Sequence, residues 1–154
     1  ANGGTVYQPH VVARVLAPGT PAKPLSEPDQ SGVVRVIEPV VRSTVNLPAP
    51  TRDPIVQGLG QVTRGGTAAG AFAGFNQTAF PIVGKTGTAQ VVGQADTSVF
   101  AAYAPAGAPK YAVAAVMEEA GFGSETAAPL VRHLYEYLFN QPVTPYVYVS
   151  TGID

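Results

Sequence analysis

One lysine stands among glycine and hydroxyl residues within a strongly apolar stretch, FPIVGKTGTAQVV at residues 80–92. Lys85 can supply a fixed positive charge, and the neighbouring Thr86 and Thr88 can supply hydroxyl groups that donate and accept hydrogen bonds. Such a set of groups can hold a nucleotide phosphate, or it can hold a substrate carboxylate beside an acyl-transfer site. The two functions require different backbones around the same residues, so the surrounding sequence has to decide between them.

A phosphate-binding loop is the first alternative, because AFPIVGKT at residues 79–86 fits the relaxed pattern in which alanine replaces the first glycine. Such a loop needs flexible backbone whose N–H groups surround the anion and then open a helix. Residues 80–83 are instead bulky, and Pro81 has no N–H to donate. The residues that follow the lysine, TGTAQVV, are poor helix formers. The local sequence therefore argues against nucleotide binding.

A strand over residues 80–92 is the second alternative, and the β-branched and aromatic residues around Lys85 favour it. Side chains alternate along a strand, so Lys85 and Gly87 would project to one face and Thr86 and Thr88 to the other, unless a twist brings them together at an edge. Gly87 would then let a substrate backbone come close to the strand. The flanking hydroxyl groups could bind a carboxylate.

Composition excludes several classes of partner. The 154 residues include nine basic and ten acidic ones, for a net charge of −1, which argues against nucleic acid and anionic membranes as partners. The absence of cysteine excludes disulfides, thiolate metal sites and a cysteine nucleophile. No apolar run approaches the ~20 residues of a membrane span. No signal sequence opens the chain, so any signal or anchor is expected to have been removed or never to have existed.

The remaining titratable residues suggest no metal site and no cofactor. His10 follows a proline in an extended segment, and His133 has no acidic or histidine partner four residues away. Glu118 and Glu119 are adjacent, so in a strand they would face opposite sides and would not form a cooperating pair of carboxylates.

The sequence of residues 1–66 predicts extended structure followed by a helix. Residues 5–16 and 32–41 have strand composition, and the proline-rich segment 17–31 between them is expected to be a solvated loop. A helix is expected to begin at Thr51 or Asp53, with Pro54 at its first position, and to end at Gly65 and Gly66.

The rest of the chain predicts an antiparallel meander backed by a helix, which gives an α+β fold. Strands are expected within residues 79–92, 98–105 and 110–121, the last two joined by a short reversal. A helix capped by Ser124 or Thr126 should follow and lie across one face of the sheet. Its predicted apolar stripe consists of Ala127, Leu130, Val131, Leu134 and Leu138. Nothing in the tail at residues 141–154 specifies a role.

At Lys85-Thr86-Gly87 the sequence resembles the penicillin-recognising serine acyltransferases, whose third signature is K-T-G on a strand beside the active site. Further segments extend the resemblance in order and spacing: ANGG and QPHVV near the start, GTA at 66–68, then VGKTGTAQ, VFAAYAP and KYAVAAVMEEAG. The chain resembles the C-terminal part of the transpeptidase domain of a class B penicillin-binding protein, and within that class the elongation-type members of actinobacteria. The resemblance extends from residue 1 to about residue 140.

Two signatures of that family are missing from these residues. None of the serines at 26, 31, 43, 98, 124 and 150 has a lysine three residues later, so S-x-x-K is absent. S-x-N is absent too, because STVN at 43–46 has one residue too many. In the family both signatures precede the segment that this chain resembles. We therefore expect the sheet half of a transpeptidase domain, inactive alone, whose partner is a complementary fragment that carries both signatures.

The resemblance implies a role for each residue of the strand. A serine outside this chain would attack a peptidoglycan stem peptide, and β-lactams would imitate that substrate. Lys85 would supply positive charge and support proton transfer, while the hydroxyls of Thr86 and Thr88 would bind the terminal carboxylate of the peptide. Gly87 would allow its close approach, and the backbone N–H of Thr88 would form part of the oxyanion hole. Gln90 would line the same groove.

The resemblance also implies a location, since the whole protein would be membrane-anchored at the extracytoplasmic face of the cell membrane. Two other functions remain open on the residues alone. One is a phosphate-loop nucleotide-binding protein, and the other is a non-catalytic β module that is structural or binds a partner.

Overall fold

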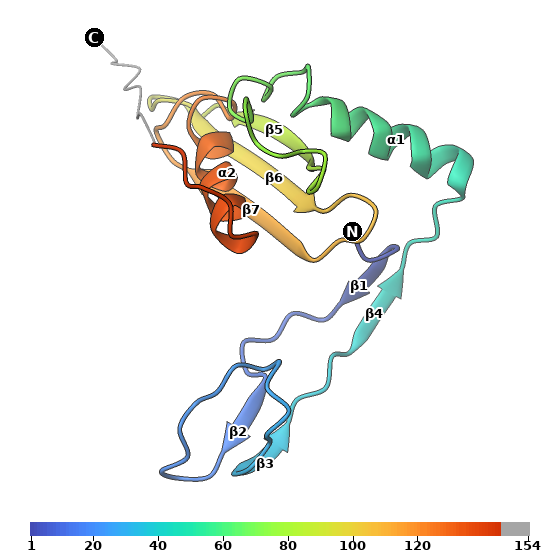
Figure 1. Ribbon diagram of the computed structural model, residues 1–154, viewed down its shortest axis with the longest axis vertical. Coiled ribbons are helices and arrows are strands. Elements are labelled where there is room, and N and C mark those ends of the chain that lie inside the picture. The colour runs from blue at the N-terminus through green and yellow to red at the C-terminus, as the bar shows by residue number, and fades with distance from the viewer. Residues whose placement is uncertain (146–154) are drawn as a thin grey trace. The chain divides into compact units, whose positions relative to one another are not determined.

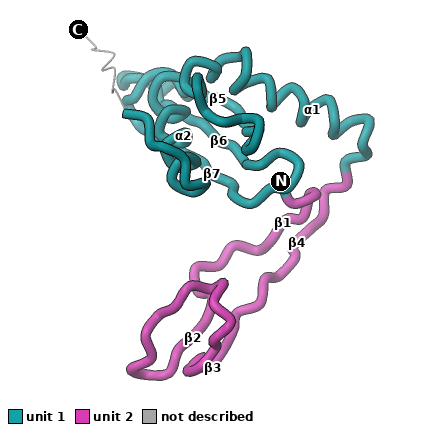
Figure 2. The backbone as a smooth tube through the Cα atoms, in the orientation of Figure 1, with its two compact units in different colours: residues 1, 47–154 teal, residues 2–46 magenta. Residues whose placement is uncertain are grey.

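The computed structural model describes residues 1–145 (Figure 1). The chain forms two compact units, one of residues 2–46 and one of residue 1 with the chain from Leu47 onward (Figure 2). Most of the tail considered above, residues 146–154, lies outside the described residues.

The unit of residues 2–46 consists of two short antiparallel ladders. Strand β1 (Thr5–Tyr7) pairs with β4 (Val41–Thr44), and β2 (Arg14–Leu16) pairs with β3 (Val33–Val36). The predicted segment 5–16 contains β1 and β2 with a break between them, and the segment 32–41 contains β3, whereas β4 begins only at its last residue. The proline-rich segment between the two is irregular. No residue from 2 to 46 is buried, so backbone pairing rather than apolar burial holds this unit together.

The larger unit is built on a three-stranded antiparallel sheet in the order β5 (Val83–Ala89), β6 (Thr97–Ala104) and β7 (Tyr111–Met117). Helix α2 (Ala127–Leu138) packs on one face of it against β6 and β7, as Figure 1 shows. This confirms the predicted meander, its helix and the α+β class. The core lies between that face, α2 and the segment that precedes β5. It contains Ala68, Phe72, Phe75, Ile82, Phe100, Ala102, Ala104, Ala115, Ala127, Ala128, Val131 and Tyr135.

Helix α1 (Ala49–Gln61) begins earlier than the sequence predicted. Its N-cap is Pro48, and neither Thr51 nor Asp53 caps it, so those predictions are wrong. Pro50 already supplies the fixed φ that suits a first turn, which moves the start upstream and leaves Pro54 inside the helix. The helix also ends at Gln61 rather than at the two glycines.

The predicted stripe on α2 is rotated relative to the face that the helix buries. Ala127, Val131 and Tyr135 are completely buried, whereas Leu130 and Leu134 are 37% and 41% exposed. The row at i, i+4 from Ala127 includes Tyr135, a larger core residue than either leucine, and that row therefore faces the sheet. The two leucines lie on the neighbouring row.

The first N–H of α2 is capped from the sheet and not from its own N-terminus. Thr126 is the N-cap residue, but its hydroxyl donates to the Ala120 carbonyl at 2.7 Å and makes no capping hydrogen bond to the helix. The predicted side-chain cap from Ser124 or Thr126 is therefore absent. Ser98 of β6 accepts from the Ala127 N–H at 3.1 Å and donates to the Phe122 carbonyl at 3.0 Å. Because Ser98 is fully buried, it fixes the start of α2 on the sheet.

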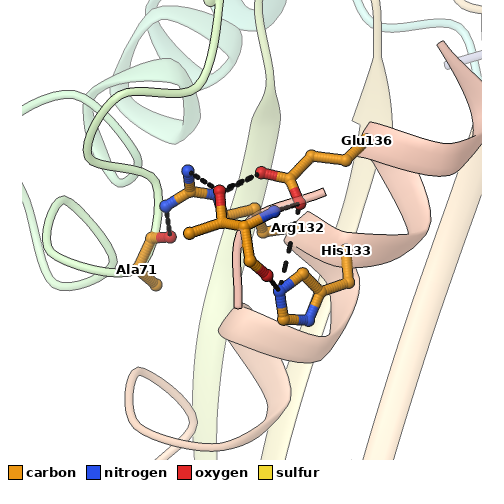
Figure 3. A network of polar contacts seen from close by, with 5 residues as sticks. Ala71, Arg132, His133 and Glu136 are labelled. Atoms are coloured by element: carbon orange, nitrogen blue, oxygen red, sulfur yellow. Dashed lines mark hydrogen bonds and ion pairs between the residues drawn. The ribbon is translucent and has the colours of Figure 1, made fainter. Parts of the chain in front are cut away.

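A polar network holds the outer part of α2 to two other segments (Figure 3). Arg132 donates to Glu136 at 2.8 Å and to the Ala71 carbonyl at 3.0 Å, and Thr144 donates both its N–H and its hydroxyl to Glu136. Burial raises the pKa of Glu136, but the bonds from Thr144 and Arg132 outweigh it and leave the pKa below its usual value. His133 Nε2 lies 3.9 Å from Glu136 Oε2, so its acidic neighbour is three residues away and not four.

Replacing Tyr135 by phenylalanine is expected to stabilise the protein. Its hydroxyl is buried without a hydrogen-bond partner among residues 1–145, and burial raises its pKa. Losing that unsatisfied group should raise the free energy of unfolding by about 1 kcal/mol. Chemical denaturation of Tyr135→Phe measures the gain, and Tyr137→Phe, whose ring is exposed on the same helix, is the neutral control. A loss of stability would show that the hydroxyl has a partner elsewhere in the protein.

Candidate active site

Strand β5 places the lysine and the two threonines on the outer edge of the sheet, since among residues 1–145 only β6 pairs with it. The strand runs from Val83 to Ala89, which confirms a strand at the centre of the predicted range and leaves Gln90 just beyond its end. No helix opens at Thr86, so the backbone is not that of a phosphate-binding loop.

The predicted alternation of faces is confirmed by the residues opposite. Thr86 pairs with Phe100, which is buried on the face that α2 covers, and Lys85 pairs with Ala101, which is exposed. Gly84 lies on the covered face, where an added Cβ would come within 2.8 Å of the Ala102 Cβ and 2.9 Å of Phe100 Cζ. Close packing of the ring over this glycine holds the start of β5 against the core.

The ammonium group of Lys85 turns back to the strand edge, where it meets the threonine that follows. Nζ donates to the Thr86 carbonyl at 2.6 Å and lies 3.4 Å from its Oγ1. The charge and one hydroxyl thus come together although their side chains leave the strand on opposite faces. None of the ion pairs among residues 1–145 includes Lys85, so these residues leave its charge available to a ligand.

Thr67 completes this cluster from a different part of the chain. Its Oγ1 lies 2.8 Å from Thr86 Oγ1. The sequence of the segment GTA at 66–68 predicts no such role for Thr67, because nothing local indicates that a residue 19 positions away will meet the strand.

The face of the sheet opposite α2 is apolar and partly hollowed beside Lys85. A depression of about 350 Å³ is floored by the sheet and bordered by Leu59 of α1. Farther along this face, Val116 is 66% exposed. A bare apolar surface of this kind is uncommon on a soluble monomer. The lining residues are Leu59, Val83, Gly84, Lys85, Ala101, Ala102, Tyr103, Ala112, Val113 and Ala114.

The other titratable residues singled out above do not gather into a site. Within the described part of the chain no three histidine or acidic residues come together as metal ligands. Glu118 and Glu119 are exposed, and the exposed His10 lies 3.4 Å from the Gln8 carbonyl two residues away. No helix in residues 1–145 is both long and apolar enough to cross a membrane.

Comparison with known proteins identifies the family. The model of the penicillin-binding protein transpeptidase domain matches residues 1–136, so the chain belongs to that family. The match supports the resemblance to penicillin-binding proteins that the sequence around Lys85 indicates, and it extends over nearly the whole chain.

Particular relatives agree with this assignment. The chain is 38% identical over 91 residues to the peptidoglycan D,D-transpeptidase MrdA of Haemophilus influenzae, covering 49% of this chain and 14% of the relative. Among solved structures, Pseudomonas aeruginosa PBP2 in complex with WCK 5153 is 32% identical with a TM-score of 0.53, over 82% of this chain and 26% of that one. The D,D-transpeptidase domain of a peptidoglycan glycosyltransferase from Eggerthella lenta is 25% identical with a TM-score of 0.64, over 94% and 30%. The chain thus spans less than a third of each of these relatives.

Proposed function

We propose that this chain forms the sheet wall of the active site of a peptidoglycan D,D-transpeptidase, a cell-wall cross-linking enzyme that β-lactams inhibit. The observation that carries the proposal is the edge strand β5, where the Lys85 ammonium and the Thr86 hydroxyl meet beside a free strand edge. The nucleophilic serine comes from another part of the protein, because no S-x-x-K lies in these residues.

In this reaction the serine oxygen attacks the carbonyl of the penultimate D-alanine of a stem peptide. The bond to the terminal D-alanine breaks, and that residue leaves with a proton on its amine. The acyl group, held as an ester on the serine, then passes to the amine of a neighbouring strand, and the serine regains its proton. Lys85 supports these proton transfers through the serine of S-x-N, and the Thr86 and Thr88 hydroxyls bind the terminal carboxylate.

The backbone of β5 supports a further role for Thr88. The Thr86 carbonyl accepts from Lys85 Nζ and therefore points to the free edge of the sheet. Backbone groups two residues apart on a strand point the same way, so the Thr88 N–H is directed to that edge as well. There it serves as one donor of the oxyanion hole, where loss of a donor commonly costs on the order of 3 kcal/mol. Gly87 keeps this stretch clear of side chains, and Gln90 borders the groove beyond it.

The bare apolar face of the sheet supports a further part of the proposal, because soluble monomers rarely expose such a surface. A complementary segment with S-x-x-K and S-x-N covers this face and brings its nucleophilic serine next to Lys85. The whole protein acts at the extracytoplasmic face of the cell membrane, to which it is anchored outside this chain.

Labelling with a fluorescent penicillin tests the proposed function. The whole protein is expected to form a stable acyl-enzyme on a serine of its S-x-x-K signature, and the 154-residue chain alone is expected to remain unlabelled because it lacks that serine. Mass spectrometry of the labelled peptide locates the ester. Labelling of one of the chain's own serines, or none of the whole protein, would contradict the proposal.

A further inference from the structure

Thr67 has no part in the reaction as proposed so far, yet its hydroxyl lies 2.8 Å from that of Thr86. We propose that Thr67 is a positioning residue, which orients the Thr86 hydroxyl toward the carboxylate of the ligand and so sets the preference for carboxylate-bearing substrates. This inference rests on the proposed function, since it concerns the carboxylate-binding role of Thr86.

The loop around Thr67 is held firmly on both sides. Ala68 is completely buried in the core, and its N–H donates to the Val62 carbonyl at 2.9 Å. At Gly66 an added Cβ would come within 2.9 Å of the Val62 Cα, so the loop backbone lies directly against the chain that leaves α1. Thr67 therefore stands between two residues that have little freedom to move.

The same segment is also tied to the start of β5. Thr63 is buried, and its hydroxyl lies 2.9 Å from Gln77 Oε1 and 3.3 Å from the carbonyl of Ile82, the residue just before the strand. Gln77 in turn donates to the Thr63 carbonyl at 2.8 Å. The segment that carries Thr67 is thus joined to the start of the strand that carries Thr86 by a second set of contacts, buried at Ile82 and partly buried at Gln77, which supports the positions of the two hydroxyls.

The hydrogen-bonding capacity of Thr86 shows what Thr67 adds. A threonine hydroxyl has one proton and two acceptor positions. Lys85 Nζ lies on one acceptor side at 3.4 Å. When Thr86 gives its proton to a ligand carboxylate, Thr67 donates into the remaining acceptor position. That donation polarises the Thr86 hydroxyl and strengthens its bond to the carboxylate, because hydrogen bonds in a chain reinforce one another.

Removal of the Thr67 hydroxyl should therefore weaken recognition of the carboxylate and spare the rest of the reaction. Thr67→Val keeps the shape of the side chain without its hydroxyl, and Thr67→Ser keeps the hydroxyl. In the whole protein, we expect Thr67→Val to slow acylation by benzylpenicillin about 10-fold, but acylation by its methyl ester, which lacks the carboxylate, less than about 2-fold. Thr67→Ser should restore the rate with benzylpenicillin to within about 2-fold of the wild type.

The measurement is the second-order rate constant of acylation for both compounds, with Thr78→Val as the control. Thr78 is exposed in the same unit and makes no hydrogen bond through its hydroxyl that involves residues 1–145. Equal losses with the acid and the ester would indicate a merely structural role and overturn the inference, as would no loss with either. If Thr67→Val does not fold, Thr67→Ala gives the same comparison. Failure of the wild type to be acylated would instead overturn the proposed function itself.

Discussion

Replacing Lys85 by methionine is expected to slow acylation of the whole protein by penicillin by about 10²–10⁴-fold, the range typical of a lost acid–base group. The aliphatic stem of Lys85 lines the apolar depression, and methionine would fill that space without charge. The ammonium group, which donates to the Thr86 carbonyl at 2.6 Å, would be lost. The change therefore removes the charge from the strand edge while it preserves packing, and the rate of acyl-enzyme formation measures the effect.

Two further variants test this interpretation, one at a distant lysine and one at position 85. Lys110→Met removes a lysine that lies over the Tyr111 ring, before strand β7, and should leave the rate unchanged. Lys85→Arg keeps the charge but spreads it over a planar group with a different donor geometry, so only partial activity is expected. A Lys85→Met protein that reacts as fast as the wild type would show that β5 is not a wall of the active site.

The strand that carries Lys85 could be predicted from the sequence because its evidence is local. Bulky and β-branched residues precede the lysine, and glycine follows where a helix would have to begin, so the chain there could form a strand and not a phosphate loop. The alternation of faces follows from strand geometry alone. The return of Nζ to Thr86 does not, because it depends on the rotamers of a long side chain.

The partners that fix the site could not be predicted, since each lies far away in the sequence. Thr67 meets Thr86 across 19 positions, and Ser98 caps Ala127 across 29. A threonine or serine hydroxyl is compatible with many environments, so its type indicates no particular partner. Thr67 meets Thr86 because the segment before β5 packs against the sheet, and Ser98 meets Ala127 because α2 packs on β6.

The orientation of α2 shows how a local pattern can indicate a helix and still mistake its buried face. Leucines at 130 and 134 outweigh alanines in any hydrophobicity pattern, so the sequence predicts a stripe that includes them. The sheet instead accepts the small residues Ala127 and Ala128 at close range and the large Tyr135 farther along. Which row fits is decided by the shape of the facing strands, and the helix sequence does not contain that information.

Replacing Gly123 by alanine is expected to disrupt both stability and activity. A Cβ at this position would lie 2.3 Å from the Val99 carbonyl oxygen and 2.4 Å from that of Gly87, distances at which something must shift. Gly123 itself cannot easily lift away, because Phe122 accepts from the buried Ser98 and the Gly123 carbonyl accepts from Ala128 at 2.9 Å. The strain therefore falls on the ladder between β5 and β6, at the residue between Thr86 and Thr88.

Overpacking of this kind costs typically about 1–3 kcal/mol of unfolding free energy. A displacement of about 1 Å at Gly87 would also move the proposed carboxylate and oxyanion groups, for which a loss of about 10²-fold in acylation rate is expected. Gly107→Ala provides the matched control, because an added Cβ there meets nothing within 4 Å. Gly123→Ala should lower both the free energy of unfolding, measured with denaturant, and the acylation rate. The control should change neither quantity. If the Gly123 variant kept wild-type activity, the loop would be able to yield without moving the strand, and the close support of β5 by this glycine would not be needed for the geometry of the site.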